Sequence, residues 1–156
     1  MTKINKEESG WIIALSWLSA LEETARDFHG TRPHVFAKRA YEHSVQHYIH
    51  RLGNEYGLRM EKANSIHQAV DNYIKLGIEA GLFRDASDFD IDEQNPFYLS
   101  ITVHNCKYKK SCRALIEQGF IGCFRAAVKV IANIDCDYKV QDFDIDGMCK
   151  GYIERI

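Results

Sequence analysis

The side chains best suited to chemistry lie in the C-terminal half of the chain, which holds all five cysteines: Cys106, Cys112, Cys123, Cys136 and Cys149. Structural zinc is held by four cysteine or histidine side chains in a tetrahedron. Cys106 and Cys112 flank a loop in which their thiols can converge, and Cys149 is the third predicted ligand, with His104 or Cys136 as the fourth. The alternative is that each thiol is a small buried hydrophobic group, since the Cys106–Cys112 spacing is wider than in a zinc knuckle.

A reactive cysteine is a second kind of chemistry that this region suggests. His104 lies two residues before Cys106, and on a strand this spacing places both side chains on one face. An imidazole beside a thiol can act as the base that activates it for nucleophilic attack. The sequence has no phosphate-binding loop, dinucleotide fingerprint or nucleophile elbow. An enzyme with a reactive Cys106 or Cys112 is therefore kept as an alternative.

Three histidines recur at helical spacing further upstream: His43, His47 and His50. Two histidines four residues apart on a helix can bind a metal ion between them. These three lie on the face opposite Val45 and Ile49, which should point inward. We therefore predict that the histidine face is a solvated polar surface.

Residues 113–133 are predicted to form a helix that carries an unusual stripe of small residues. Its polar seam, which includes Arg125 and Lys129, is narrow, and this indicates a helix buried around most of its girth. Each glycine inside a helix costs about 1 kcal/mol relative to alanine, so Gly119 and Gly122 need a packing role. They allow another backbone, or a flat ligand, to approach the helix axis. Close packing alone and the wall of a ligand cavity both stay open.

Periodicity divides the chain into three helices, two strands, a long helix and two final strands. Gly57 and Gly81 are predicted to end the second and third helices. The expected helices are 7–29, 31–56, 61–80 and 110–133, the expected strands are 87–91, 97–104, 138–145 and 149–156, and the expected hairpin turns are 92–96 and 146–147. The predicted fold is α+β, with N-terminal helices packed on an antiparallel sheet of about four strands and a long buried helix between two hairpins.

Length and composition favour one globular domain over residues 1–156. The chain is long enough to bury a core, is 46% hydrophobic and has only two prolines, which argues against disorder. A net charge of −2 and a small basic cluster around Tyr108 predict no nucleic-acid binding. The apolar patch at 11–21 is too short for a membrane span. Five cysteines without a disulfide spacing pattern predict reduced thiols and a cytoplasmic location.

Three stretches of the C-terminal half together resemble a known family. They are a strand that ends in HNCKYKKSC (104–112), a helix with GFIGCFRAAVKVI (119–131), and the hairpin DYKVQDFDIDGMCKGYI (137–153), which carries a cysteine near its last strand. They resemble the 4-vinyl reductase, or hydrocarbon-binding, domain family, which shares its fold with subunits of the transport protein particle that tethers vesicles. The resemblance covers about residues 65–156, and the preceding helices are compatible with the same fold.

The resemblance implies a mixed α/β domain, commonly dimeric, with an apolar cavity between helices and sheet. Members bind aromatic effectors or are associated with bacteriochlorophyll synthesis, and some hold zinc through cysteines near the final hairpin. Gly119, Phe120 and Gly122 match the helix motif of the family, and Cys149 matches its last-strand cysteine.

The chain departs from the family in the strand that precedes the one carrying Cys149. Where members often have a second cysteine, this sequence has Gln141, and its hairpin is shorter. A zinc site of the family type would therefore need Cys106 or Cys112 as a substitute ligand. No fused regulatory or DNA-binding domain accompanies the resemblance.

The resemblance implies a sensor or carrier domain for a hydrophobic or aromatic small molecule, such as a tetrapyrrole-like ligand. Residues 1–30, with Trp11 and Trp17, are the expected homodimer contact. One alternative is an enzyme that acts on a small hydrophobic or pyrrole-type substrate, and another is an interaction scaffold without a pocket. The residues expected to line the ligand site are Tyr73, Gly119, Phe120, Gly122, Cys123 and Arg125. Arg125 or Lys129 is the expected partner for a ligand carboxylate.

Overall fold

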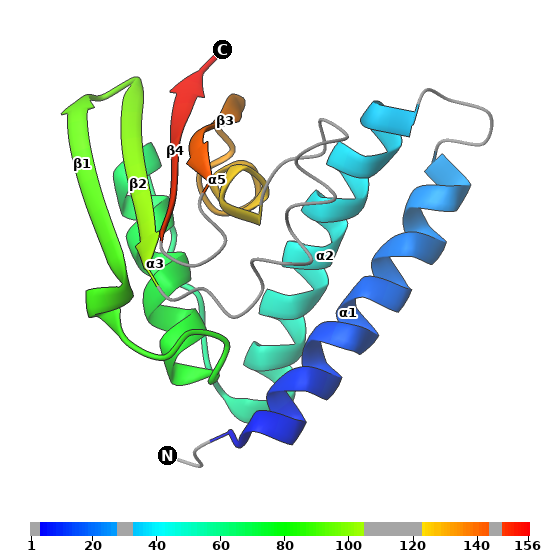
Figure 1. Cartoon of the computed structure of the whole chain (residues 1–156). Coiled ribbons are helices and arrows are strands. Elements are labelled where there is room, and N and C mark those ends of the chain that lie inside the picture. Colours follow the sequence, from blue (N-terminus) through cyan, green and yellow to red (C-terminus); the bar gives the residue numbers. More distant parts are fainter. Residues whose placement is uncertain (1–3, 28–32, 105–122, 144–147) are drawn as a thin grey trace.

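Alternating apolar and polar residues in the C-terminal half form a four-stranded antiparallel sheet, and the N-terminal half is helical (Figure 1). The structure is a computed structural model, and it describes residues 4–27, 33–104, 123–143 and 148–156. The predicted α+β class is confirmed. The elements are α1 (Lys6–Asp27), α2 (Pro33–Tyr56), α3 (Ile66–Glu79), the 3₁₀ turn η1 (Ala86–Asp88), β1 (Phe89–Asn95), β2 (Tyr98–His104), α5 (Cys123–Ala132), β3 (Cys136–Phe143) and β4 (Met148–Arg155).

Three helices end at residues that adopt a left-handed backbone. Gly57 (φ 70°) follows α2, and Gly81 (φ 75°) follows α3, as the sequence predicts. Asn133 (φ 53°) follows α5. A positive φ costs glycine little and is tolerated by asparagine, so each residue stops its helix and redirects the chain.

The third helix begins later than predicted. It was expected from residue 61, but α3 starts at Ile66 because Ser65 caps it. The backbone N–H of Gln68 donates to Oγ of Ser65 at 3.1 Å, and the Gln68 side-chain oxygen accepts from the backbone N–H of Asn64 at 2.9 Å. In a standard capping box the second bond goes to the backbone N–H of the N-cap residue, whereas here it goes to that of Asn64, one residue earlier. The two bonds together fix the first turn of α3.

The sheet has the strand order β1-β2-β4-β3, and every neighbouring pair is antiparallel. The first turn is shorter than the predicted 92–96, because β1 continues through a bulge to Asn95 and pairs there with Tyr98. The Phe97 backbone N–H donates to Oδ1 of Asn95 at 2.9 Å, which closes this turn. The predicted turn at 146–147 lies outside the described residues.

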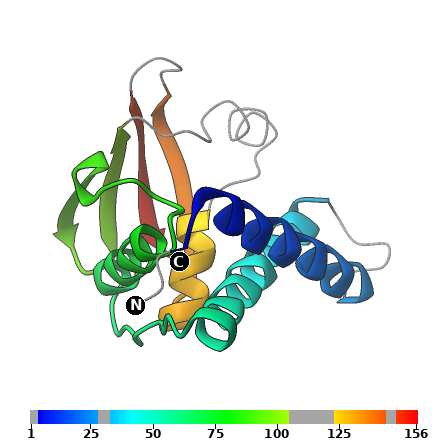
Figure 2. The ribbon, with the colours of Figure 1, turned by 90° about the horizontal axis from the view of Figure 1, so that it is seen from below.

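The helices lie in successive layers on one face of the sheet (Figures 1 and 2). α3 packs against β2 and α5 packs against β3, so these two helices cover the inner face. α2 packs against α5, and α1 packs chiefly against α2, furthest from the sheet. α5 is therefore enclosed between the sheet, α3 and α2.

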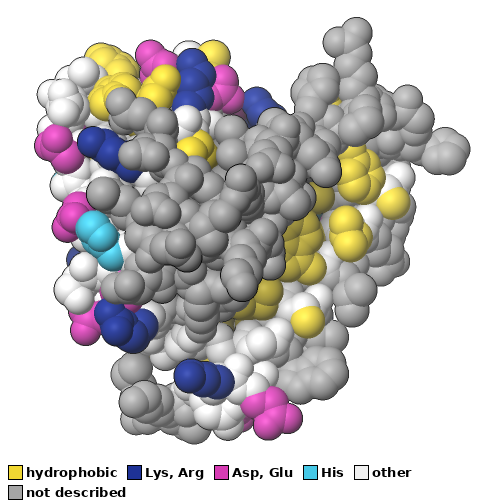
Figure 3. All heavy atoms as spheres, in the orientation of Figure 1, with side chains coloured by type: hydrophobic (Ala, Val, Ile, Leu, Met, Phe, Trp, Pro, Cys, Tyr) yellow, Lys and Arg dark blue, Asp and Glu magenta, His cyan; other side chains and the backbone are white. Residues whose placement is uncertain are grey.

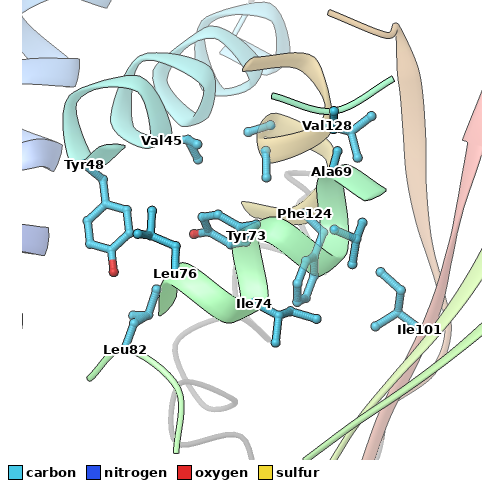
Figure 4. Close-up of a cluster of buried hydrophobic side chains, with 14 of the residues drawn as sticks. Val45, Tyr48, Ala69, Tyr73, Ile74, Leu76, Leu82, Ile101, Phe124 and Val128 are labelled. Carbon is cyan, nitrogen blue, oxygen red and sulfur yellow. The ribbon is translucent and has the colours of Figure 1, made fainter. Parts of the chain in front are cut away.

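The core is continuous through these layers. Ala126, Ala127 and Val128 of α5 are fully buried, as are Leu99 and Ile101 on the inner face of the sheet. Figure 4 shows α2, α3, α5 and the sheet contributing side chains to one apolar cluster. The described part of α5 is thus buried around most of its girth, as predicted.

Few large hydrophobic side chains are exposed on the described surface. Leu21, Phe97 and Ile156 are the exposed large hydrophobics there, and Figure 3 shows further apolar side chains over α1 and α2 on the face of Figure 1. Of the helices that the structure describes, none has the length and apolar character needed to cross a bilayer.

Candidate functional site

Four aromatic rings meet at the start of α5. Phe124, the second residue of this helix, has ring centroids of Tyr73, Phe83 and Phe89 at 6.1, 6.4 and 6.1 Å. Phe83 closes the group, with its centroid 6.0 Å from that of Tyr73 and 4.9 Å from that of Phe89. Four of these five pairs are edge-to-face, which aromatic quadrupoles favour. We call Tyr73, Phe83, Phe89 and Phe124 the aromatic cluster.

A glycine inside α3 makes room for this cluster. A methyl group at Gly77 would lie 2.4 Å from Cδ2 of the Phe83 ring, which is far inside van der Waals contact. The backbone N–H groups of Leu82 and Phe83 both donate to the carbonyl oxygen of Gly77, at 2.7 and 3.1 Å. These bonds hold Phe83 over the helix, so this helix glycine is explained by close packing.

We expect Gly77→Ala to lower the free energy of unfolding by about 1 to 2 kcal/mol, because displacement of Phe83 outweighs the better helix propensity of alanine. The matched control is Gly10→Ala in α1, where a methyl group would meet nothing within 4 Å. The control should raise stability by about 0.5 to 1 kcal/mol. Urea unfolding measures both values, and equal effects of the two substitutions would contradict the packing explanation.

The structure brings some of the predicted site residues together. Tyr73 is buried in the aromatic cluster beside Phe124 (Figure 4), and Cys123 is half-buried one residue before Phe124. Gly119, Phe120 and Gly122 lie outside the described residues. In the sequence they precede Cys123, the first described residue of α5.

Arg125 lies on the other side of α5, against α2. Its Nη2 is 3.0 Å from Oε1 of Glu42 and donates at 3.1 Å to the carbonyl oxygen of Lys38. The Arg125 side chain is 6% exposed and that of Glu42 14%, so the ion pair is nearly buried. Because Glu42 already neutralises the guanidinium, Arg125 has a structural role, and no ligand carboxylate is needed to explain its burial.

The described strands separate the predicted metal ligands. Cys149 pairs with Val103, so both side chains share the inner face, whereas His104 follows Val103 and points to the outer face. His104 and Cys149 therefore cannot bind one ion. Cys136 pairs with Arg155, six residues along β4 from Cys149, a separation of about 20 Å.

Two of the three predicted zinc ligands, Cys106 and Cys112, lie outside the described residues. Within residues 4–27, 33–104, 123–143 and 148–156, no group of three or more His, Cys, Asp or Glu side chains is placed to hold a metal ion. Zinc binding through Cys106, Cys112 and Cys149 therefore stays a prediction.

Cys136 is a buried thiol under α5. Its Sγ is 3.9 Å from the carbonyl oxygen of Arg125. Burial raises the pKa of the Cys136 thiol from 9.0 to about 11, and the positive charge of Arg125 offsets only part of this effect. Since the thiolate is the nucleophile, Cys136 is unreactive near neutral pH.

The raised pKa of Cys136 predicts a loss of stability at alkaline pH. Between pH 9.0 and about 11, the unfolded chain releases the thiol proton while the folded chain retains it, so stability falls as pH rises. The expected contribution is about 2 kcal/mol. It is measured as the difference in urea unfolding between the natural protein and Cys136→Ser across this range. A constant difference would contradict the prediction.

The predicted solvated histidine face is wrong for His43. Its side chain is only 4% exposed, and its two ring nitrogens lie 3.1 Å from Oε2 of Glu23 and 2.8 Å from Oδ2 of Asp27, both on α1. His47 is also only partly exposed, and its Nε2 lies 2.6 Å from the same Glu23 oxygen. His50 is exposed as predicted. The prediction failed because α2 is packed on two sides, by α1 and by α5.

His104 contacts a carboxylate at the end of β2. Its Nε2 is 2.6 Å from Oδ2 of Asp90 on the neighbouring strand β1. A carboxylate that orients an imidazole is one part of an activated-nucleophile arrangement. Cys106, the thiol that this imidazole would activate, lies outside the described residues.

Two surface depressions among the described residues are polar. One of about 180 Å³ lies beside α3, and one of about 270 Å³ lies between α2 and α5. Neither is lined by Tyr73, Cys123 or Arg125, so neither matches the predicted apolar cavity beside Gly119 and Gly122. The lining residues are Arg59, Met60, Glu61, Asn72, Lys75, Leu76 and Glu79 for the first, and Arg39, Glu42, Gln46, Lys129, Val130 and Asn133 for the second.

Sequence reasoning missed several residues of this region. Phe83 and Phe89 complete the aromatic cluster, and Glu42 binds Arg125 from 83 residues away. The glycine at 77, inside a helical pattern and six residues before Phe83, was a usable signal of close approach. No local pattern marks Glu42 as a partner of Arg125.

No known protein-family model matches the chain, and no curated protein is significantly similar to it. The resemblance to the 4-vinyl reductase domains therefore stays a prediction.

Proposed function

We propose that the protein is a small-molecule-binding domain of the 4-vinyl reductase type, which holds a hydrophobic or aromatic ligand as a sensor or carrier. The ligand would lie beside Gly119, Phe120 and Gly122, at the end of α5 that carries Cys123. The aromatic cluster would form the inner wall of this site. The layered arrangement of helices on one face of an antiparallel sheet agrees with the fold that the resemblance implies.

One observation carries the proposal: Gly119 and Gly122 immediately precede the described part of α5 in the sequence, and Phe124 of α5 lies against three other aromatic side chains. Aromatic walls with few polar groups are typical of sites for flat apolar ligands. Arg125 is not needed, because Glu42 already binds it.

The experiment is a titration with the uncharged fluorescent probe N-phenyl-1-naphthylamine. We expect saturable binding to the natural protein, and Gly122→Leu should weaken it at least about tenfold by occupying the space for the ligand. Gly10→Leu, at an open position of α1, is the matched control and should bind as the natural protein does. Absence of saturable binding, or equal affinity of Gly122→Leu, would refute the proposal and favour a scaffold without a pocket.

The homodimer that the resemblance implies would use the outward face of α1. Trp17 is only partly buried, with its ring 4.9 Å from that of Tyr41, and Leu21 one turn later is 43% exposed. The two residues share a helix face. Sedimentation analysis should give a dimer that Leu21→Glu dissociates and that Lys75→Glu, on α3, leaves intact. A monomer at high concentration would refute this part of the proposal.

The second candidate function is an enzyme with a reactive Cys106, and the His104–Asp90 contact favours it. Asp90 would orient the imidazole, and the imidazole would take the thiol proton. Iodoacetamide labelling followed by peptide mass spectrometry should then show Cys106 reacting faster at pH 7 than Cys136, and His104→Gln should slow it at least about tenfold. An unchanged Cys106 rate in His104→Gln would exclude this mechanism.

A further inference from the structure

Five charged or titratable side chains join the C-terminal half of α1 to the middle of α2. They are Glu23 and Asp27 of α1, and Arg39, His43 and His47 of α2, and we call them the α1–α2 clasp. His43 is its centre, since both of its ring nitrogens face carboxylate oxygens. This arrangement is separate from the proposed ligand site and does not depend on it.

The geometry around His43 suits a protonated ring. Carboxylates only accept hydrogen bonds, and a neutral imidazole has one N–H to donate, whereas the imidazolium has two. Nε2 of His43 is hydrogen-bonded to Oδ2 of Asp27 at 2.8 Å, whereas Nδ1 lies 3.1 Å from Oε2 of Glu23 without a hydrogen bond to it. The positive charge of a protonated ring would attract both carboxylates, which strengthens the contact between the helices.

The charged side chains around His43 do not neutralise Glu23 and Asp27 in place of a protonated His43 ring. Arg39 Nε is 3.8 Å from Asp27, but its Nη1 is 2.9 Å from Glu42, so its charge is shared between two carboxylates. His47 Nε2 is 2.6 Å from Oε2 of Glu23, so this carboxylate oxygen is shared by two imidazole rings. On the α5 side of α2, Arg125 is paired with Glu42 and Lys129 with Asp135.

Beside the clasp, several of the described side chains that the two helices bury are small. The buried residues Ser16, Ala20 and Thr24 follow one another at single-turn spacing on α1, and Ala40 and Ser44 do so on α2. The hydroxyls of Ser16 and Thr24 donate back to carbonyl oxygens of their own helix, at 2.7 and 2.6 Å. Small side chains bury few methylene groups, so hydrophobic contact alone holds the helices weakly here.

We infer that the α1–α2 clasp is a pH-responsive contact. It holds α1 on α2 when His43 is protonated, and the packing of α1 on α2 becomes looser when His43 is neutral. Histidine is the side chain that proteins most often use as a pH-responsive group. α1 packs chiefly on α2, and loosening therefore acts on α1 while the sheet, α3 and α5 keep their contacts.

The test is amide hydrogen exchange of residues 20–27, read at pH 6 and pH 8 and corrected for the intrinsic pH dependence of exchange. In the natural protein we expect these amides to exchange about three- to tenfold faster at pH 8 after correction, with α3 unchanged. His43→Gln should abolish the difference. His67→Gln, which removes another histidine contact with a carboxylate at 2.6 Å, is the matched control and should keep it.

A second variant covers the case in which His43→Gln fails to fold. Asp27 is 40% exposed, so Asp27→Asn should fold, and it should reduce the pH response because one of the two acceptors has lost its charge. Equal exchange of residues 20–27 at both pH values in the natural protein would overturn the inference. An undiminished response in both folded variants would also overturn it.

Discussion

Glu42→Ala is expected to lower the free energy of unfolding by about 3 to 5 kcal/mol, because it leaves the Arg125 guanidinium buried without a counter-charge. The side chains of Glu42 and Arg125 are 14% and 6% exposed, and their closest atoms are 3.0 Å apart. The carbonyl oxygen of Lys38 would be the remaining hydrogen-bond acceptor for Nη2 of Arg125, and it carries no full charge. Urea unfolding at neutral pH measures the loss.

The matched control for this prediction is Arg125→Met, which removes the buried cation and keeps an apolar side chain of similar length. Glu42 then still binds Arg39 at 2.9 Å, so we expect a loss smaller than half of that in Glu42→Ala. The double variant Glu42→Ala/Arg125→Met should be about as stable as Arg125→Met alone. If Glu42→Ala costs less than about 1 kcal/mol, the pair does not behave as a buried one.

Phe124→Ala is expected to lower the free energy of unfolding by about 3 to 5 kcal/mol, since it removes the ring shared by three pairs of the aromatic cluster and leaves a cavity. Phe124 is only 7% exposed, so solvent does little to compensate for the lost packing of its ring. The same measurement on Phe124→Leu should give less than about 1.5 kcal/mol, because much of the volume is kept.

The control for this prediction is Phe97→Ala at the β1–β2 turn. Phe97 is 57% exposed, and its ring lies 5.8 Å from the guanidinium carbon of Arg155. Removing an exposed ring with one cation–π contact should cost less than about 1 kcal/mol. Similar losses for Phe97→Ala and Phe124→Ala would mean that the aromatic cluster is not a well-packed part of the core.

Much of the fold follows from local patterns in the sequence. Gly57 and Gly81 end their helices with the positive φ that glycine accepts, and alternation predicts all four strands. The burial of α5 follows from its narrow polar seam. These features are predictable because each depends on residues that lie close together in the sequence.

The failures occur where a contact joins distant segments. His43 was assigned to a solvated face, because the prediction took one side of α2 as inner and did not foresee α1 on the other. For Arg125 the sequence did not reveal the ion pair with Glu42, because the two residues are 83 positions apart. Both residues are charged or titratable groups whose role is fixed by tertiary neighbours, which periodicity does not reveal.

The central claim is the proposal that a hydrophobic small molecule binds beside Gly119 and Gly122. Its most direct test is native mass spectrometry of the protein purified from its own source, compared with the mass after denaturation. The claim predicts an additional noncovalent mass of a small organic molecule that is absent after denaturation and lost in Gly122→Leu. A native mass equal to that of the bare chain, together with no uptake of N-phenyl-1-naphthylamine, would contradict it.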